Sequence, residues 1–354
     1  MSKAASPYSG LGRTHFWRRS ISNIERHQVD PVVSPRFSIS KSETVATAGS
    51  CFAQHIARAL QVLDFNYLVA ERSQELSAQA ALERGYGVFS ARYGNIYTAR
   101  QLLQLFQRAQ SEIQPAEDFW KRPDGHFADP YRPNVEPGGF RSLSQLHRDR
   151  EAHLRSVRTM FAEADVFVFT MGLTEAWRSR RDGAVFPIVP GVTAGEYDPD
   201  LHEFVNFDVA ETVADMQDFL DRLFTVNPLV KVLLTVSPVP LIATYEDRHV
   251  LSATTYSKAV LRVAAEQLIR SNAGVDYFPS YEIITGSYNG GVYYEADARQ
   301  VTRAGVSHAM RCFARHYLEG AAEAPAAAIV PASIPAEASS GIICDEEAID
   351  QIRA

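Results

Sequence analysis

The part of this 354-residue chain best suited to chemistry is the pair Gly49-Ser50, which lies between a strand pattern and a helix pattern. The β-branched run that ends at Ala48 predicts a strand, and the three- and four-residue spacing of apolar residues after Ser50 predicts an amphipathic helix. Gly49 permits a tight turn between them, so the Ser50 hydroxyl would lie at the carboxyl edge of a sheet, where ligands bind in parallel α/β folds. There Ser50 could act as a nucleophile, with the N–H groups of the first helical turn stabilising an oxyanion. The same pattern also fits a serine that only caps the helix.

Short apolar runs alternate with longer stretches of helical period along the chain. This alternation predicts an α/β fold in which a parallel sheet carries helices on both faces, with a crossover after each strand. The expected strands are Thr44–Ala48, Asn66–Val69, Val166–Thr170, Lys231–Val236 and Val275–Phe278. The expected helices are Cys51–Val62, Thr98–Gln110, Ser142–Ala162, Val209–Thr225, Ala253–Ser271 and Thr302–Leu318.

Two segments break the alternation. Residues 111–140 are rich in proline and glycine, and residues 178–207 are rich in glycine, proline and aspartate. Both follow an element expected at the top of the sheet, so we interpret them as insertions that roof a site. Residues 1–318 are accordingly predicted to form a single domain. Residues 319–354 are rich in alanine and proline and are predicted to be a flexible tail, with a short acidic helix at Asp345–Ile352.

Composition and motifs argue against several classes of protein. The net charge is −7 and no basic stripe is visible, so no nucleic-acid partner is expected. The three cysteines, Cys51, Cys312 and Cys344, contain no C-x-x-C pair, which speaks against a disulfide framework and a structural zinc site. Nucleotide-binding and zinc-peptidase signatures are missing, and we expect neither a cofactor nor a metal. No signal peptide and no apolar run of about 20 residues is found, so we expect no membrane span and a cytoplasmic protein.

The string Gly49-Ser50-Cys51-Phe52-Ala53 resembles the motif that names the GSCFA family. The resemblance covers roughly residues 6–317, and its further blocks are Phe16–Arg18, Tyr93–Thr98, Thr170–Trp177, Thr235–Pro240 and Tyr256–Lys258. That family is similar in organisation to the SGNH (GDSL-like) hydrolases, a superfamily of esterases, lipases and carbohydrate O-acyl hydrolases or transferases. The resemblance implies a three-layer α/β/α sandwich with a five-stranded parallel sheet of flavodoxin-like order. It also implies that Ser50 is the nucleophile.

Two further sequence blocks of the superfamily have counterparts in this sequence, but one of the two counterparts differs from the superfamily pattern. Gly94 and Asn95 could supply an oxyanion donor or align the acyl group, although an asparagine beside a glycine is also a common turn. The next block is Gly172-x-Thr174-Glu175, where the superfamily has an asparagine donor. Glu175 could orient a histidine or bind a sugar hydroxyl; alternatively it caps a helix or pairs with Arg178 or Arg180.

The last block departs most from the superfamily, which places Asp-x-x-His near the C-terminus. Asp297 is present, but the third residue after it is Gln300, which cannot act as a base. His308, His249 and His55 are the histidines that could take its place, although histidines at such positions are more often ordinary core or surface residues. We expect His308 because it is nearest to Asp297 in the sequence.

Two residues with reactive groups have open roles. Cys51, beside the expected nucleophile, could contribute its N–H to the oxyanion site or react as a thiolate, but it could also pack as a small hydrophobe. Lys258, at the start of the expected fifth helix, could bind an anionic substrate or form a solvated ion pair.

The resemblance implies a serine-dependent esterase or O-acyltransferase. Its expected partner is a small-molecule or carbohydrate ester, with an acyl donor in the case of transfer. The aromatic residues Trp120, Trp177 and Tyr131 suit a carbohydrate or glycoconjugate substrate, although aromatic rings also pack cores. The alternative is a binding module that keeps the pocket but has lost the histidine.

Overall fold

The computed structural model of the chain describes residues 6–321 and 347–350. Its central sheet has four parallel strands in the order β1-β4-β8-β9, where β1 is Val45–Gly49, β4 is Val166–Met171, β8 is Lys231–Val236 and β9 is Val275–Tyr277. All four lie where the apolar runs predicted strands. The prediction of an α/β fold with a parallel sheet is therefore confirmed.

The expected strand at Asn66–Val69 is reduced to one parallel bridge, between Tyr67 and Val45 on the outer edge of β1. The pairing stops because the next N–H on this edge, that of Thr47, donates to the Ser90 hydroxyl at 3.0 Å. A side chain from a later loop thus takes the place of a neighbouring backbone. The sheet therefore has four regular strands among the described residues, and the prediction of a fifth full strand does not hold for this segment.

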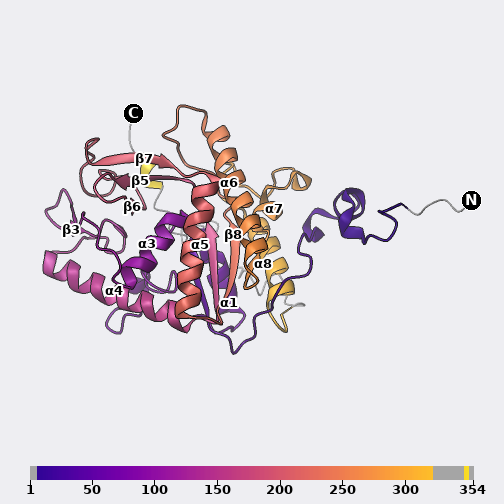
Figure 1. The fold of residues 1–354 in the computed structure, drawn as a ribbon, viewed down its shortest axis with the longest axis horizontal. Helices are drawn as coiled ribbons and strands as arrows, with labels where there is room; N and C mark the ends of the chain where they lie inside the picture. Colours follow the sequence, from indigo (N-terminus) through magenta and orange to yellow (C-terminus); the bar gives the residue numbers. More distant parts are fainter. Residues whose placement is uncertain (1–5, 322–346, 351–354) are drawn as a thin grey trace, which may run out of the picture.

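Helices cover both faces of the sheet (Figure 1). One face packs against α1 (Ala53–Val62), α7 (Ser280–Thr285) and α8 (Arg303–Tyr317). The other packs against α3 (Ala99–Ala109), α4 (Leu143–Glu163), α5 (Val209–Val226) and α6 (Val250–Ser271). Side chains of β4 alternate between the two cores: Val168 points to the first, and Phe167 and Phe169 point to the second. Further short helices are η1 (Arg13–His15), η2 (Arg18–Ser22), η3 (Arg26–Gln28), α2 (Ala78–Glu83) and η4 (Ser287–Asn289).

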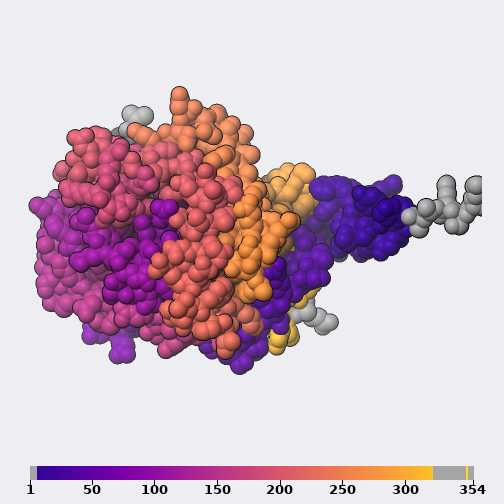
Figure 2. All heavy atoms as spheres, viewed as in Figure 1, coloured from indigo at the N-terminus to yellow at the C-terminus, as the bar shows by residue number. Residues whose placement is uncertain are grey.

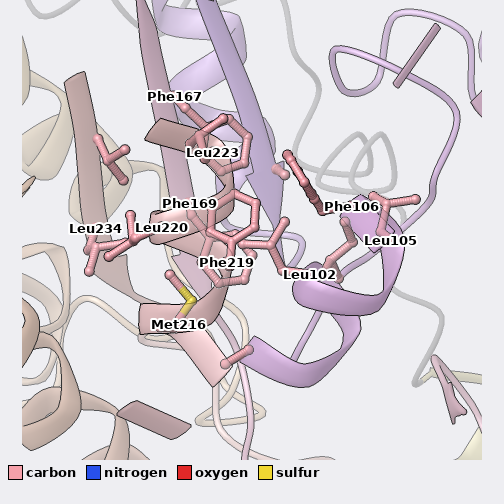
Figure 3. Close-up of a cluster of buried hydrophobic side chains, with 14 of the residues drawn as sticks. Leu102, Leu105, Phe106, Phe167, Phe169, Met216, Phe219, Leu220, Leu223 and Leu234 are labelled. Carbon is pink, nitrogen blue, oxygen red and sulfur yellow. The ribbon is translucent and has the colours of Figure 1, made fainter. Parts of the chain in front are cut away.

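Aromatic rings fill the second core (Figure 3). Phe106 of α3 lies 5.8 Å from Phe219 of α5, centroid to centroid, and Phe219 lies 5.7 Å from Phe167 of β4. All three side chains are buried. Burying a side chain of this size contributes roughly 1.5–3 kcal/mol, so this cluster holds the helices against the strand that ends beside the candidate site.

The two segments that interrupt the alternation contribute small antiparallel sheets. β2 (Trp120–Lys121) pairs with β3 (Phe127–Ala128). β5 (Glu175–Ser179) pairs with both β6 (Val185–Phe186) and β7 (His202–Asn206). The two pieces pack together, because Phe186 lies 5.2 Å from Trp120 and 5.7 Å from Tyr131, centroid to centroid.

A buried ionic network fastens the first of these segments to α4. Asp129 accepts from Arg132 at 3.0 Å and from Arg150 of α4 at 3.1 Å. Arg132 also donates to Asp149 at 2.5 Å. Burial alone would raise the pKa of Asp129, but the guanidinium groups of Arg132 and Arg150 more than offset this and hold it well below its usual range.

The ends of the described chain lie apart. The N-terminal part of the described chain projects from the body, as the indigo lobe of Figure 2 shows. It meets the body at His27, whose carbonyl accepts from Arg311 of α8 at 3.1 Å. At the other end Glu319 still contacts the body, where its N–H donates to the Ile39 carbonyl at 3.0 Å. The expected acidic helix is present as α10 (Glu347–Asp350), while most of the expected tail lies outside the described residues. No helix of the described part is both long and apolar enough to cross a bilayer.

Candidate functional site

Gly49 turns the chain at the carboxyl end of β1. Its φ of +136° lies in the region that L side chains rarely adopt, and a β-carbon there would stand 2.4 Å from the Thr170 carbonyl oxygen. The next N–H, that of Ser50, donates to the same oxygen at 3.1 Å. Only glycine therefore lets the chain pass this close to β4 and place Ser50 at the carboxyl edge of the sheet.

The Ser50 hydroxyl is buried and makes no hydrogen bond to any described residue. The residue is 3% exposed. Helix α1 begins at Ala53 with Phe52 as its N-cap and without a side-chain cap. The interpretation of Ser50 as a helix cap is therefore wrong. A buried hydroxyl without a partner costs free energy, and a catalytic role is one of the reasons for which proteins keep such a group.

Gly172, just after β4, lies directly beside Ser50. A β-carbon on Gly172 would stand 3.1 Å from Ser50 Cβ and 3.1 Å from Tyr97 Cδ1. The Tyr97 carbonyl accepts from the N–H of Gly172 at 2.9 Å and from the N–H of Leu173 at 3.1 Å. Because its N–H is engaged in this way, Gly172 shapes the site rather than donating to an oxyanion.

Gly94 and Asn95 reach the same edge. Gly94 has a φ of +72°, and the N–H of Ile96, one residue after Asn95, donates to the Gly49 carbonyl at 2.9 Å. Asn95 is buried and lines two small cavities of about 40 and 20 Å³. The three separate sequence blocks at Gly49, Asn95 and Gly172 therefore meet at one point.

Lys258 contacts the place where Gly49, Asn95 and Gly172 meet. Its Nζ donates to the Gly172 carbonyl at 2.6 Å, and the residue is 1% exposed. The preceding residue is also fixed, because Ser257 Oγ accepts from the N–H of Thr174 at 3.1 Å. The interpretation of Lys258 as half of a solvated ion pair is therefore wrong, since its amine is in the interior beside the site.

Thr174 faces β7, and Glu175 faces the segment after β8. Thr174 Oγ1 donates to Asn206 at 2.6 Å, and Glu175 accepts from the hydroxyl of Thr244 at 2.7 Å and from the N–H of Tyr245 at 3.4 Å. Burial and the charge of Glu246 raise the pKa of Glu175, and the two hydrogen bonds only partly offset this.

Two alternatives for Glu175 can be decided. The residue begins strand β5, so it does not cap a helix. Arg178 and Arg180 both pair with Glu203, at 2.6 and 2.7 Å, rather than with Glu175.

His308 has both ring nitrogens bound elsewhere. Tyr293 Oη and His308 Nδ1 are 2.8 Å apart, and His308 Nε2 lies 2.7 Å from the Val29 carbonyl. Since a carbonyl only accepts, Nε2 carries the proton and the tyrosine donates to Nδ1. Burial lowers the pKa of His308 to about 4. These contacts make His308 a core histidine that connects α8 to the N-terminal segment.

The other two histidines are likewise engaged away from the serine. His249 is exposed and caps α6, its Nδ1 accepting from the N–H of Leu251 at 3.1 Å. His55 is half-buried on α1 with its ring 5.3 Å from that of Phe52, and burial together with the charge of Arg58 lowers its pKa to about 3. As the Ser50 hydroxyl has no partner in the described part of the chain, no histidine there forms a dyad with it.

Asp297 lies near the carboxyl edge of β8 but acts on its own loop. The loop is held there by Tyr294, whose hydroxyl donates to the Pro238 carbonyl at 2.7 Å. Asp297 is exposed, and its Oδ1 accepts from the N–H groups of Arg299 and Gln300, at 2.9 Å each. Its carboxylate stabilises this turn and orients no imidazole through those bonds.

Both described cysteines are buried and free. Burial raises the pKa of Cys312 to about 12, which makes it an inert part of the core beside α1. Cys51 is 6% exposed, in keeping with a packed side chain next to Ser50. No group of three or more metal-ligating side chains occurs within the described residues.

A pocket of about 420 Å³ opens next to this point. Tyr97, which contacts Gly172, and Leu173, which follows it, both line the pocket. Its remaining wall is mainly aromatic and aliphatic, with Gln101, Glu175 and Thr244 as polar groups. It includes Trp177, Phe186, Tyr197, Phe204, Leu241 and Tyr245. Neither Tyr97 nor Tyr245 was predicted as a site residue, although Tyr97 falls within the block Tyr93–Thr98 and Tyr245 follows the proline loop after β8.

Comparison with known proteins gives a family but no characterised relative. No curated protein and no solved structure matches the chain significantly. The model of the GSCFA family matches residues 44–313, which include Ser50, Asn95, Gly172 and Lys258. The chain therefore belongs to the GSCFA family.

Proposed function

We propose that the protein is a serine-dependent esterase or O-acyltransferase in which Ser50 attacks an acyl ester. The observation that carries this proposal is the buried Ser50 hydroxyl, which is held by a strained glycine turn at the carboxyl edge of the sheet and has no partner among the described residues. Carboxyl edges of parallel sheets are where such folds bind ligands. The Tyr67 bridge on the outer side of β1 also supports a five-position, SGNH-like strand order.

Lys258 is the base that we assign to Ser50. It is buried, and its amine donates to the carbonyl of the glycine that packs on the serine. The amine makes no hydrogen bond to the Ser50 hydroxyl in this structure, so it would have to move from that carbonyl to the hydroxyl in order to act as a base. In its neutral form the amine would take the Ser50 proton as Oγ bonds to the acyl carbon, and it would then protonate the departing alkoxide. In the second step water or a sugar hydroxyl would attack the acyl carbon and give its proton to the amine. The amine would then pass this proton to Ser50 Oγ as the bond between Oγ and the acyl carbon breaks, which restores the free serine. Ser–Lys pairs are a recognised variant of the serine triad.

The oxyanion would be held by the N–H of Cys51 and the side-chain amide of Asn95. The other nearby N–H groups are already used: that of Ser50 by Thr170, that of Gly172 by Tyr97 and that of Thr174 by Ser257. Fixed donors aimed at developing charge supply a large part of catalysis in acyl transfer. Removing one such donor typically lowers kcat by about 10²–10³.

The pocket would bind the part of the ester beyond the reacting carbonyl. Trp177, Tyr197 and Tyr245 give it aromatic faces, and Glu175 and Thr244 give it a polar group that a sugar hydroxyl could meet. This arrangement supports the carbohydrate or glycoconjugate ester that the aromatic residues suggested. Trp120, by contrast, is buried in the cluster between the two interrupting segments.

The second candidate function is that of a binding module without catalysis. It is favoured because no histidine of the described residues is hydrogen-bonded to Ser50. Incubation with a fluorophosphonate probe and turnover of short p-nitrophenyl esters separate the two. We expect probe labelling and turnover that disappear in Ser50→Ala and persist in Ser237→Ala, which changes a buried serine directly after β8. A wild-type protein that is neither labelled nor active on any ester or acyl donor would favour the binding module.

A further inference from the structure

The C-terminal helix α10 contacts the pocket from the far end of the chain. Ala348 and Ile349 pack against the cluster of Trp120, Phe186 and their neighbours that joins the two interrupting segments. Ile349 also lines the 420 Å³ pocket, together with Trp177 and Tyr245. In Figure 1 this short yellow helix lies beside β5 and β6.

Docking, rather than helix propensity, must hold α10 in place. The helix spans only Glu347–Asp350, whereas isolated helices below about 12–15 residues are marginal in water. Its two apolar residues are flanked by acidic ones, so the segment has little to bury except Ala348 and Ile349. Their contacts with the aromatic cluster are thus the source of its order.

The same aromatic surface serves both the helix and the pocket. Trp177 packs in the cluster that Ile349 joins, and it lines the cavity as well. A ligand that filled the cavity would meet the Ile349 side chain and compete with it for Trp177. Helix α10 and a bound ligand would therefore contact the same apolar surface.

We propose that residues 347–350 form an intramolecular lid that occupies part of the pocket and competes with any apolar ligand. When the lid is docked, the binding-competent fraction of the protein is reduced, and the apparent dissociation constant rises by the inverse of that fraction. This inference goes beyond the proposed function, because it concerns binding and requires no reaction at Ser50.

The test is a titration of the full-length protein with anilinonaphthalene sulfonate, an apolar fluorescent probe. Ile349→Asp should undock the lid and tighten probe binding about tenfold, equivalent to about 1.4 kcal/mol. The matched control is Leu229→Asp, which makes the same kind of change at a residue that is 89% exposed before β8, and it should bind the probe as the wild type does. Unchanged or weaker binding by Ile349→Asp would overturn the proposal, because Ile349 would then be irrelevant or a fixed part of the wall.

A second measurement supplies the lid in trans. A synthetic peptide of residues 341–354 added to the Ile349→Asp protein should displace the probe in a saturable way, and a peptide with the Ile349→Asp change should not. Failure of both peptides to compete would contradict docking. Both measurements are to be repeated in a Ser50→Ala background, where the same results are expected whether or not Ser50 is a nucleophile.

Discussion

Gly172 lies so close to Ser50 that a β-carbon on the glycine would stand 3.1 Å from Cβ of the serine. The same atom would meet Cα of Tyr97 at 3.2 Å, so it has no free direction in which to move. The carbonyl of Gly172 meanwhile holds the amine of Lys258. One residue without a side chain thus brings a hydroxyl, an amine and a pocket wall together.

Gly172→Ala should therefore lower both the reactivity of Ser50 and the stability of the fold. We expect the rate of fluorophosphonate labelling to fall by about 10²-fold, since a displacement near 1 Å can cost that much, while overpacking costs about 1–3 kcal/mol. Gly274→Ala is the matched control, because its β-carbon would make only ordinary contacts, 3.6 Å from Phe224. Equal labelling of both variants would contradict the assigned geometry.

Substitution of Lys258 distinguishes a base from a fixed charge. Lys258→Met keeps the volume in the interior, and Lys258→Arg keeps the charge but cannot deprotonate. If Lys258 is the base, the fluorophosphonate probe should label Ser50 at least about 10²-fold more slowly in both variants, and the labelling rate should no longer depend on pH. Lys231→Met serves as the control, as that lysine also donates to a main-chain carbonyl, that of Ser38. Activity retained in Lys258→Arg would assign the residue an electrostatic role instead.

The sequence predicted the elements that depend on local pattern. Apolar runs marked all four central strands, and the strand–Gly–Ser–helix pattern placed Ser50 at the sheet edge. The hydrogen-bond partners of the site residues could not be predicted from local pattern, because each partner lies far away in the sequence. Lys258 binds a carbonyl 86 residues before it, and His308 binds one 279 residues before it.

Two further expectations concern contacts between distant parts of the chain. The strand expected at Asn66–Val69 fails because Ser90, from a later loop, takes the hydrogen bond of Thr47. Sequence proximity to Asp297 suggested His308 as the base, yet the helix that carries it turns the ring toward Tyr293 and Val29. Neither contact leaves a periodic signal in the sequence.

His308→Gln should reduce stability but leave Ser50 labelling unchanged, since the ring is engaged by Tyr293 and Val29. The pKa of His308 in the folded protein is about 4, below the usual 6.5, so between these values the unfolded chain binds more protons. The stabilising contribution is thus complete above pH 6.5 and is lost as the pH falls toward 4. Urea unfolding at pH 8 and pH 5 should show the difference between wild type and variant shrinking by roughly 2–3 kcal/mol. A labelling rate that falls as far as in Ser50→Ala would instead restore His308 as the base.

The ionic network around Asp129 should control how firmly the first interrupting segment is held. Asp129→Asn removes the charge that faces Arg132 and Arg150 in the interior, and breaking such a buried pair costs about 3–5 kcal/mol. Because the pKa of Asp129 is lowered in the folded protein, this contribution is present above the unfolded value of about 3.9 and is lost as the pH falls below it. Asp124→Asn, in the same segment, removes a carboxylate that pairs with Arg122 at 3.2 Å on the surface, and it should change stability little because solvent screens such a pair. Hydrogen exchange should then show faster opening of residues 111–140 in Asp129→Asn alone. Equal protection in the two variants would mean that aromatic packing of Trp120 and Tyr131 on Phe186, and not the charges, holds this side of the pocket.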